Sequence, residues 1–315
     1  AETGDDMSVM CTRAQAAALA IDELDRQIDQ VFASMGVDPS AAHALARQTV
    51  DALPADSSLG GRARHALGMT ECLLGRIADG CASLTAACET LQTHGPARAA
   101  CRAWRDYGSA LSHLAGDTQA GSEALERALA QAGELGDPHE QGAVMIRLGP
   151  LLGRIGRIVE AQTMLERAVD LLTTSPDRSA YAGALGNLGH HHLMQGRFDL
   201  AVPLMRAELP LRESAGDRLH AVNCRSNLAI ALAGAGQGDE ALALLADLAP
   251  LIDPARDGHQ WVDYVLARGH VSLLVGDAAG ARALLQTGLD AARRQGLNTI
   301  EIDLLTLLAQ AEERC

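Results

Sequence analysis

The sequence predicts an all-α protein, built as a solenoid of about seven helical hairpins followed by a C-terminal capping helix. Three observations support this: the composition, glycines at a nearly constant interval, and apolar residues at helical spacing around each glycine. Hydrophobic residues make up 48% of the 315 residues, but aromatic residues only 2%, and Ala and Leu dominate. Ala and Leu are strong helix formers, whereas half-buried strands need Val, Ile, Thr and aromatic residues.

The strongest signal is an internal repeat, because a fixed period of this length indicates a repeat architecture. Glycines expected in short turns follow one another at intervals of 39, 41, 40, 40, 40 and 40 residues. They are Gly36, Gly75, Gly116, Gly156, Gly196, Gly236 and Gly276. Each is the expected turn between two helices, which we call helix A and helix B of a hairpin.

The residues around each glycine recur as well. A small residue follows five positions after the glycine and a long apolar residue nine positions after it, as with Ala161 and Leu165 after Gly156. Upstream, an apolar–small pair such as Leu188-Gly189 lies in helix A, and the copy at Gly116 has Gly108-Ser109 instead. A glycine inside a helix costs about 1 kcal/mol relative to Ala. We therefore expect it where helix A packs closely against the small residue of helix B, and neighbouring hairpins to stack and share a core.

This pattern resembles the tetratricopeptide repeat (TPR), in the Leu-Gly of helix A, the turn glycine and the small and leucine positions of helix B. The resemblance covers roughly residues 14–295, and segments of it look like the long-helix arrays of bacterial signalling regulators. It implies a right-handed TPR-like α-solenoid whose helices A line a concave groove. We expect seven TPR-like repeats over 14–296, a capping helix over 297–315 with a polar outer face, and a disordered extension or expression remnant over 1–13.

Charge and cysteine content exclude several classes of function. The net charge is −14, and no basic stripe suits nucleic acid or an acidic membrane. The apolar runs are far shorter than the roughly 18–20 residues of a membrane span. Seven cysteines without a C-x-x-C pair indicate buried thiols in a reducing compartment. We expect a cytoplasmic protein that binds neither nucleic acid nor membrane, with a homodimer as an open possibility.

Three consecutive histidines, His190, His191 and His192, invite a metal site. Successive helical residues point about 100° apart, so the three cannot converge on one ion, and chelation within a helix uses residues four apart. We expect no metal and no cofactor. His192 is expected to pack between helices A and B, and His190 to line the groove.

The groove residues follow from the repeat and the resemblance. Arg147, Asn187 and Asn227 are 40 residues apart, and Asn223 lies one turn before Asn227. Tyr107 is assigned the same register in its copy, and His270 is the counterpart of His190. An Asn amide can both donate to and accept from a peptide backbone, although a purely structural role for these Asn residues is an open alternative. The candidate ligand-binding residues are Arg147, Asn187, His190, Asn223, Asn227, Tyr107 and His270.

Prolines interrupt the helical pattern at a few positions. Pro150 and Pro203 lie inside expected helices, where proline removes a hydrogen bond, so we expect a bend at Pro150. Pro210 and Pro250 are 40 residues apart and are expected to mark a shared shape near the end of helix B.

No nucleophile–base motif, phosphate loop or H-E-x-x-H motif occurs, so we expect no catalysis and no catalytic residues. The favoured function is a peptide- or protein-binding TPR module, as the sensory or interaction region of a bacterial signalling or transcription regulator. One alternative is a constitutive scaffold or chaperone for an assembly or secretion system. Another is a small-molecule or metal sensor.

Overall fold

The computed structural model describes residues 19–254 and 257–314, and the predicted extension over 1–13 lies outside this range. The described residues contain only helices and their connections, and no strand. They form two compact units that divide between Gly156 and Arg157. The described helices include none long and apolar enough to cross a membrane.

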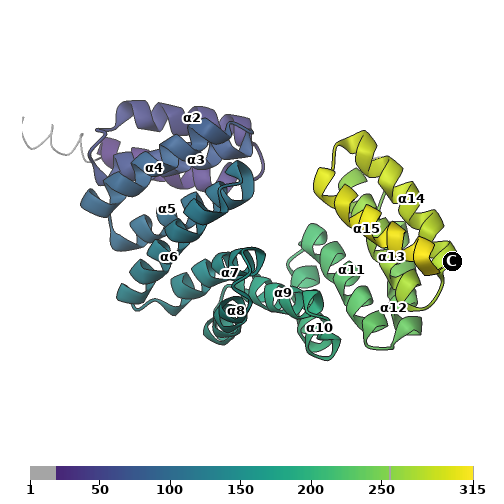
Figure 1. Ribbon diagram of the computed structural model, residues 1–315. Coiled ribbons are helices and arrows are strands. Elements are labelled where there is room, and N and C mark those ends of the chain that lie inside the picture. Colours follow the sequence, from purple (N-terminus) through teal and green to yellow (C-terminus); the bar gives the residue numbers. More distant parts are fainter. Residues whose placement is uncertain (1–18, 255–256, 315) are drawn as a thin grey trace, which may run out of the picture. The chain divides into compact units, whose positions relative to one another are not determined.

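The first unit begins with a helix over 19–34, and every later helix packs against its neighbour in the sequence (Figure 1). The helices A of this unit are the one over 19–34, α3, α5 and α7. Its remaining elements are α2 (Pro39–Ala52), α3 (Ser58–Leu73), α4 (Ile77–His94), α5 (Ala97–Ala110), η1 (Leu111–Ala115), α6 (Thr118–Glu134) and α7 (Pro138–Arg154).

The second unit follows the same plan, with α9, α11 and α13 as helices A, and with α13, α14 and α15 packed in succession (Figure 1). It consists of α8 (Ile158–Leu172), α9 (Arg178–Met194), α10 (Phe198–Ser214), α11 (Arg218–Gly234), α12 (Gly238–Leu248), η2 (Ala249–Leu251), α13 (Gly258–Leu274), α14 (Ala278–Gln295) and α15 (Asn298–Arg314). In chain order, the described helices make seven A–B pairs and a terminal helix, as the sequence predicts.

Local sequence explains where the helices begin and end. Aspartates cap many N-termini; the carboxylate of Asp117, for example, accepts the amide of Ala120 at 3.0 Å. The turn glycines from Gly75 to Gly276 have positive φ, which glycine adopts without strain. Gly36 does not, and its hairpin also has Ile28-Asp29 in place of the apolar–small pair upstream of the turn.

The glycine in helix A packs directly against helix B, which confirms the close approach predicted from the sequence. A Cβ at Gly68 would lie 2.7 Å from Cγ of Leu84 and 2.9 Å from the carbonyl oxygen of Gly80. We call the equivalent small residues the contact positions, and number other residues from them. They are Gly68, Gly108, Gly149, Gly189, Ala229 and Gly269.

Replacing Gly68 with Ala should lower the free energy of unfolding by about 1–3 kcal/mol, because the new methyl group overlaps backbone as well as side-chain atoms. The usual gain in helix propensity would not offset this overlap. Gly133→Ala is the matched control, since a Cβ there meets nothing within 4 Å, and it should leave stability equal or slightly higher. Urea unfolding measures both, and equal behaviour of the two variants would contradict close packing at Gly68.

A π-helical turn accounts for the interval of 41 residues. The element η1 is a π-helical turn over Leu111–Ala115 that continues α5 and ends at Gly116. A π-turn holds one more residue than an α-turn. Gly108 therefore lies one residue further from its turn glycine than Gly68 does. Its contact is nevertheless the same, since a Cβ at Gly108 would lie 2.8 Å from Leu125 Cγ and 2.9 Å from the Gly121 oxygen.

The prediction of a shared shape at Pro210 and Pro250 is wrong. Pro250 lies in the short turn η2 where α12 has ended, but α10 continues through Pro210 to Ser214. The buried ion pair between Glu208 and Arg212, with Nε and Oε1 3.1 Å apart, spans Pro210 and supports the helix there. Helix α7 likewise continues through Pro150, where a bend stays a prediction.

The terminal helix α15 does not have the wholly polar outer face expected of a cap. Ile302 and Leu305 are 65% and 42% exposed. Val262 and Val265, 40 residues earlier in α13, are buried against neighbouring helices. Helix α15 thus has apolar residues at the positions where the helix A α13 has them.

Candidate functional site

The helices A of the second unit are buried along most of their length but keep an accessible stripe. The stripe occupies positions six before, two before and one after the contact position, which lie on one helical face, although Ala267 at one of these positions in α13 is buried. In α9, α11 and α13 it includes Asn187, His190, Asn223, Asn227, Asp263 and His270. All five residues predicted in this unit are therefore exposed or half-buried on corresponding faces of their helices.

The stripe carries hydrogen-bonding groups that the fold does not use up. Asn223 and Asn227 make no side-chain hydrogen bond to another described residue, whereas Asn187 has an interaction within the protein. Two amides one turn apart on α11 offer donors and acceptors in the pattern that a peptide backbone requires.

The two predicted histidines on the stripe are held toward the neutral form. Desolvation lowers the pKa of His190, although its side chain reaches solvent. Desolvation, with the charge of Arg314 second, lowers the pKa of His270. A neutral imidazole has one donor and one acceptor nitrogen, so the stripe between α9 and α13 offers mainly uncharged hydrogen-bonding groups.

The neighbours of His190 are structural. His191 and His192 are buried, as predicted for His192, and their rings meet edge to face with centroids 6.1 Å apart. Within the described residues, no group of three or more His, Cys, Asp or Glu side chains could hold a metal ion.

The register assigned to Tyr107 is wrong by one residue. Because η1 absorbs an additional residue, Tyr107 lies directly before the contact position Gly108, where other helices have Leu148 or Leu188. It packs accordingly, half-buried against a core cluster with Cys72 and Leu84. The residue that corresponds to Arg147 and Asn187 is Asp106.

Arg147 itself lies on the accessible face of α7 in the first unit. Its Nη1 donates to the carbonyl oxygen of Ala143 at 3.2 Å. Burial and the nearby charge of Arg105 lower the pKa of its guanidinium. The charge of Asp106 partly offsets this effect. Asp106 itself lines a charged cavity that the sequence interpretation did not identify.

This cavity of about 620 Å³ is lined by the helices A of the first unit. Its floor includes Phe32 and Met35, from the first helix and the turn after it. Its charged walls include Arg62, Arg98, Arg102, Arg105, Asp106 and Glu140. The volume lies within the range of roughly 300–1,000 Å³ that is common for ligand pockets.

A buried network of ion pairs forms the inner wall. His65 Nε2 lies 3.0 Å from Asp106 Oδ2, and Arg105 Nε donates to Asp106 Oδ1 at 2.9 Å. Glu140 accepts from Arg102 Nε at 2.6 Å and lies 3.5 Å from Arg105 Nη1. The network links α3, α5 and α7 and satisfies both buried carboxylates.

Electrostatics keep Asp106 ionised. Burial by itself would raise the pKa of Asp106, but the charge of Arg105 and the hydrogen bonds from His65 and Arg105 hold it well below its usual range. Asp106 and Arg105 therefore form a pair of opposite charges in the wall of the cavity at neutral pH.

One sequence signal could have indicated this cavity. Arg62 and Arg102 both lie six residues before a contact position, where the second unit has Asn223 and Asp263. Counting from the turn glycine, however, separates them by one residue because of η1. When residues are numbered from the contact position, Arg62 and Arg102 of the charged cavity occupy the same helix A position as Asn223 and Asp263 of the stripe.

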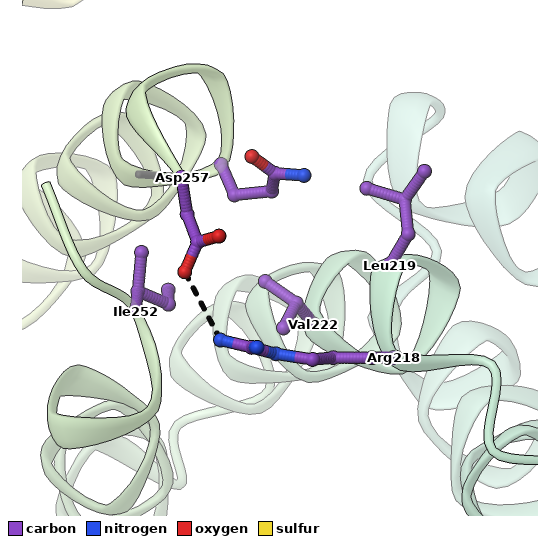
Figure 2. A pocket seen from close by; sticks show the side chains of 6 residues that line it. Arg218, Leu219, Val222, Ile252 and Asp257 are labelled. Atoms are coloured by element: carbon purple, nitrogen blue, oxygen red, sulfur yellow. Dashed lines mark hydrogen bonds and ion pairs between the residues drawn. The ribbon is translucent and has the colours of Figure 1, made fainter. Parts of the chain in front are cut away.

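A smaller cavity in the second unit, of about 190 Å³, lies between the first turns of α11 and α13 (Figure 2). Its Arg218 reaches across to Asp257, with Nη2 and Oδ2 3.0 Å apart, and also donates to the carbonyl oxygen of Leu251. Ile252 and Val222 form an apolar lining (Figure 2). Arg218 thus ties Leu251 and Asp257, which precede α13, to the start of α11. None of the seven predicted residues lines either cavity.

Comparisons with known proteins establish the fold. No protein-family model and no curated protein matches the chain. The apo form of the quorum sensor NprR from B. thuringiensis is similar in structure, with a TM-score of 0.66 at 15% identity, over 91% of this chain and 80% of that one. A Rap protein complexed with Competence and Sporulation Factor has a TM-score of 0.59 at 12% identity, over 93% and 98% of the two chains.

A third similar structure is a signal transduction ATPase of the STAND class with a tetratricopeptide repeat sensor, from Pyrococcus horikoshii. It has a TM-score of 0.65 at 11% identity, over 90% of this chain and 44% of that one. These similarities confirm the TPR-like, all-α repeat fold that the sequence predicts.

Proposed function

We propose that this chain is a non-catalytic module that binds a peptide or protein segment on accessible faces of its helices A. The observation that carries the proposal is the accessible stripe of α9 and α11, where the amides of Asn223 and Asn227 and the neutral imidazole of His190 remain available on helices that are largely buried. An extended peptide has unpaired backbone donors and acceptors, which such side chains satisfy.

We further propose that the module belongs to a bacterial signalling regulator and acts in the cytoplasm. The similar folds of a quorum sensor, of a Rap protein in complex with a named factor, and of an ATPase with a repeat sensor support this context. Ligand binding would change how neighbouring hairpins pack, as small shifts between packed helices transmit a signal in other proteins.

The test begins with panning a phage-displayed library of random dodecapeptides against the full chain. A synthetic version of a selected peptide is then titrated against the wild type and against Asn223→Ala/Asn227→Ala, because neither of these amides makes a hydrogen bond to another described residue. Each lost hydrogen-bonding side chain removes about 0.5–1.5 kcal/mol, so we expect affinity to fall by about fivefold to a hundredfold. The melting temperature should stay nearly unchanged because both side chains are partly exposed.

Gln286→Ala, on an exposed position of α14, is the matched control and should bind as the wild type does. Unchanged affinity in the double variant would remove the site assignment. Failure to select any peptide with the wild-type chain would remove the proposed function itself.

A further inference from the structure

We infer that the charged cavity of the first unit is a subsite for a carboxylate that has an apolar group beside it. The inference rests on the proposed function, because it takes an acidic residue of a bound peptide as the source of that carboxylate. It concerns the outer rim of the cavity, formed by Arg98 and Arg102.

The buried carboxylates of the cavity are already satisfied. Asp106 is held by His65 and Arg105, and Glu140 by two arginines. Both carboxylates are almost inaccessible to solvent. A ligand therefore meets the guanidinium groups around them rather than the acids themselves.

Arg98 and Arg102 keep most of their donors available. The side chain of Arg102 is 49% exposed and uses only Nε, in its bond to Glu140. The side chain of Arg98 is 58% exposed and uses only Nη2, on Asp137. In contrast, Arg105 uses all three nitrogens and Arg62 uses both terminal ones.

The two arginines are one helical turn apart on α5, so their side chains lie on the same face of the helix, about 5–6 Å apart at Cβ. Planar guanidinium groups with free donors pair with a carboxylate through two parallel hydrogen bonds. The pair with Glu140 also fixes the orientation of Arg102 before any ligand arrives, which reduces the entropy lost on binding.

The apolar residues that line the cavity determine which chemical group can lie beside the carboxylate of the ligand. Phe32, Met35 and Pro96 present apolar surface in the same cavity. Phe32 is held in place by an edge-to-face contact with His65, with ring centroids 5.1 Å apart. The complementary ligand is an acidic peptide residue, or a C-terminal carboxylate, next to an apolar side chain.

The experiment uses the full chain and peptides selected by panning, synthesised with the acidic residue as Glu and as Gln. In the wild type, the Gln peptide should bind about tenfold more weakly than the Glu peptide, the loss of roughly one charge-assisted hydrogen-bonded pair. In Arg98→Gln/Arg102→Gln the two peptides should bind equally. Arg98→Gln alone, whose only partner is Asp137, gives a partial effect and remains informative should the double variant fold poorly.

The control is Arg47→Gln/Arg127→Gln, which removes two charges from helices B of the same unit and should keep the tenfold preference. A preference that persists in Arg98→Gln/Arg102→Gln, or selected peptides without acidic residues, would overturn the subsite while leaving peptide binding intact.

A second arm removes the peptide altogether. Fluorine NMR of 4-fluorobenzoate should show line broadening with the wild type and none with Arg98→Gln/Arg102→Gln, and an excess of inorganic phosphate should not reverse it. If the fluorine signal of 4-fluorobenzoate broadens but panning yields no binding peptide, the carboxylate subsite is supported and the proposed function is rejected. No broadening with the wild type, or displacement by phosphate, would overturn the subsite.

Discussion

Asp106→Ala is expected to lower the free energy of unfolding by about 3–5 kcal/mol, since removing one partner of a buried ion pair leaves an uncompensated buried charge. The charge left behind is the guanidinium of Arg105, which would keep only its longer 3.5 Å contact with Glu140. His65 would lose its partner at the same time. Urea unfolding followed by circular dichroism measures the change.

Asp51→Ala, at an exposed position of the same unit, should change stability by no more than about 0.5 kcal/mol. A loss below about 1 kcal/mol in Asp106→Ala would show that the network contributes little.

The pH dependence of the free energy of unfolding gives an independent check on the role of Asp106. Because the pKa of Asp106 is held below its unfolded value of about 3.9, its contribution is present above that value and is lost as the pH falls below it. Asp106→Asn should therefore lose less stability than the wild type between about pH 5 and pH 3.

Leu285→Ala is expected to lower the free energy of unfolding by about 2–5 kcal/mol, toward the upper end of that range. Leu285 is fully buried in α14 and faces Gly269, where an added Cβ would lie 2.6 Å from Leu285 Cδ2. Since Gly269 has no side chain to move into the space, the cavity left by the substitution cannot collapse.

Leu305→Ala, on the exposed face of α15, is the matched control and should cost less than about 1 kcal/mol. Equal losses in the two variants would contradict the tight packing at the contact position. Thermal and urea unfolding of both variants in the same buffer decide the question.

The repeat architecture could be predicted from the sequence because its period is a local property of the chain. Turn glycines need positive φ and contact glycines need close approach, so both recur at fixed positions whatever the surface residues are. The same regularity predicted that Asn187, Asn223 and Asn227 would lie on accessible faces of their helices, and the structure places them there. Their role in binding stays a prediction.

The charged cavity could not be predicted in the same way. Its contacts join residues on different helices, such as His65 with Asp106 and Arg102 with Glu140, about one period apart in the sequence. Because the two partners are so far apart, no short stretch of sequence contains both of them. Side-chain length also matters: Arg102 reaches Glu140 from a position where Asn223 makes no hydrogen bond to another described side chain.

The π-turn at Leu111–Ala115 has a consequence for how such chains tolerate insertions and deletions. A residue added in the middle of a helix rotates everything beyond it by about 100°, which would carry core side chains to the surface. Here the added residue is confined between the core contact at Gly108 and the loop at Gly116, so neither neighbouring helix changes its orientation. The last turn of helix A is thus where this architecture can change length without loss of fold, and alignments of its relatives should place their gaps there.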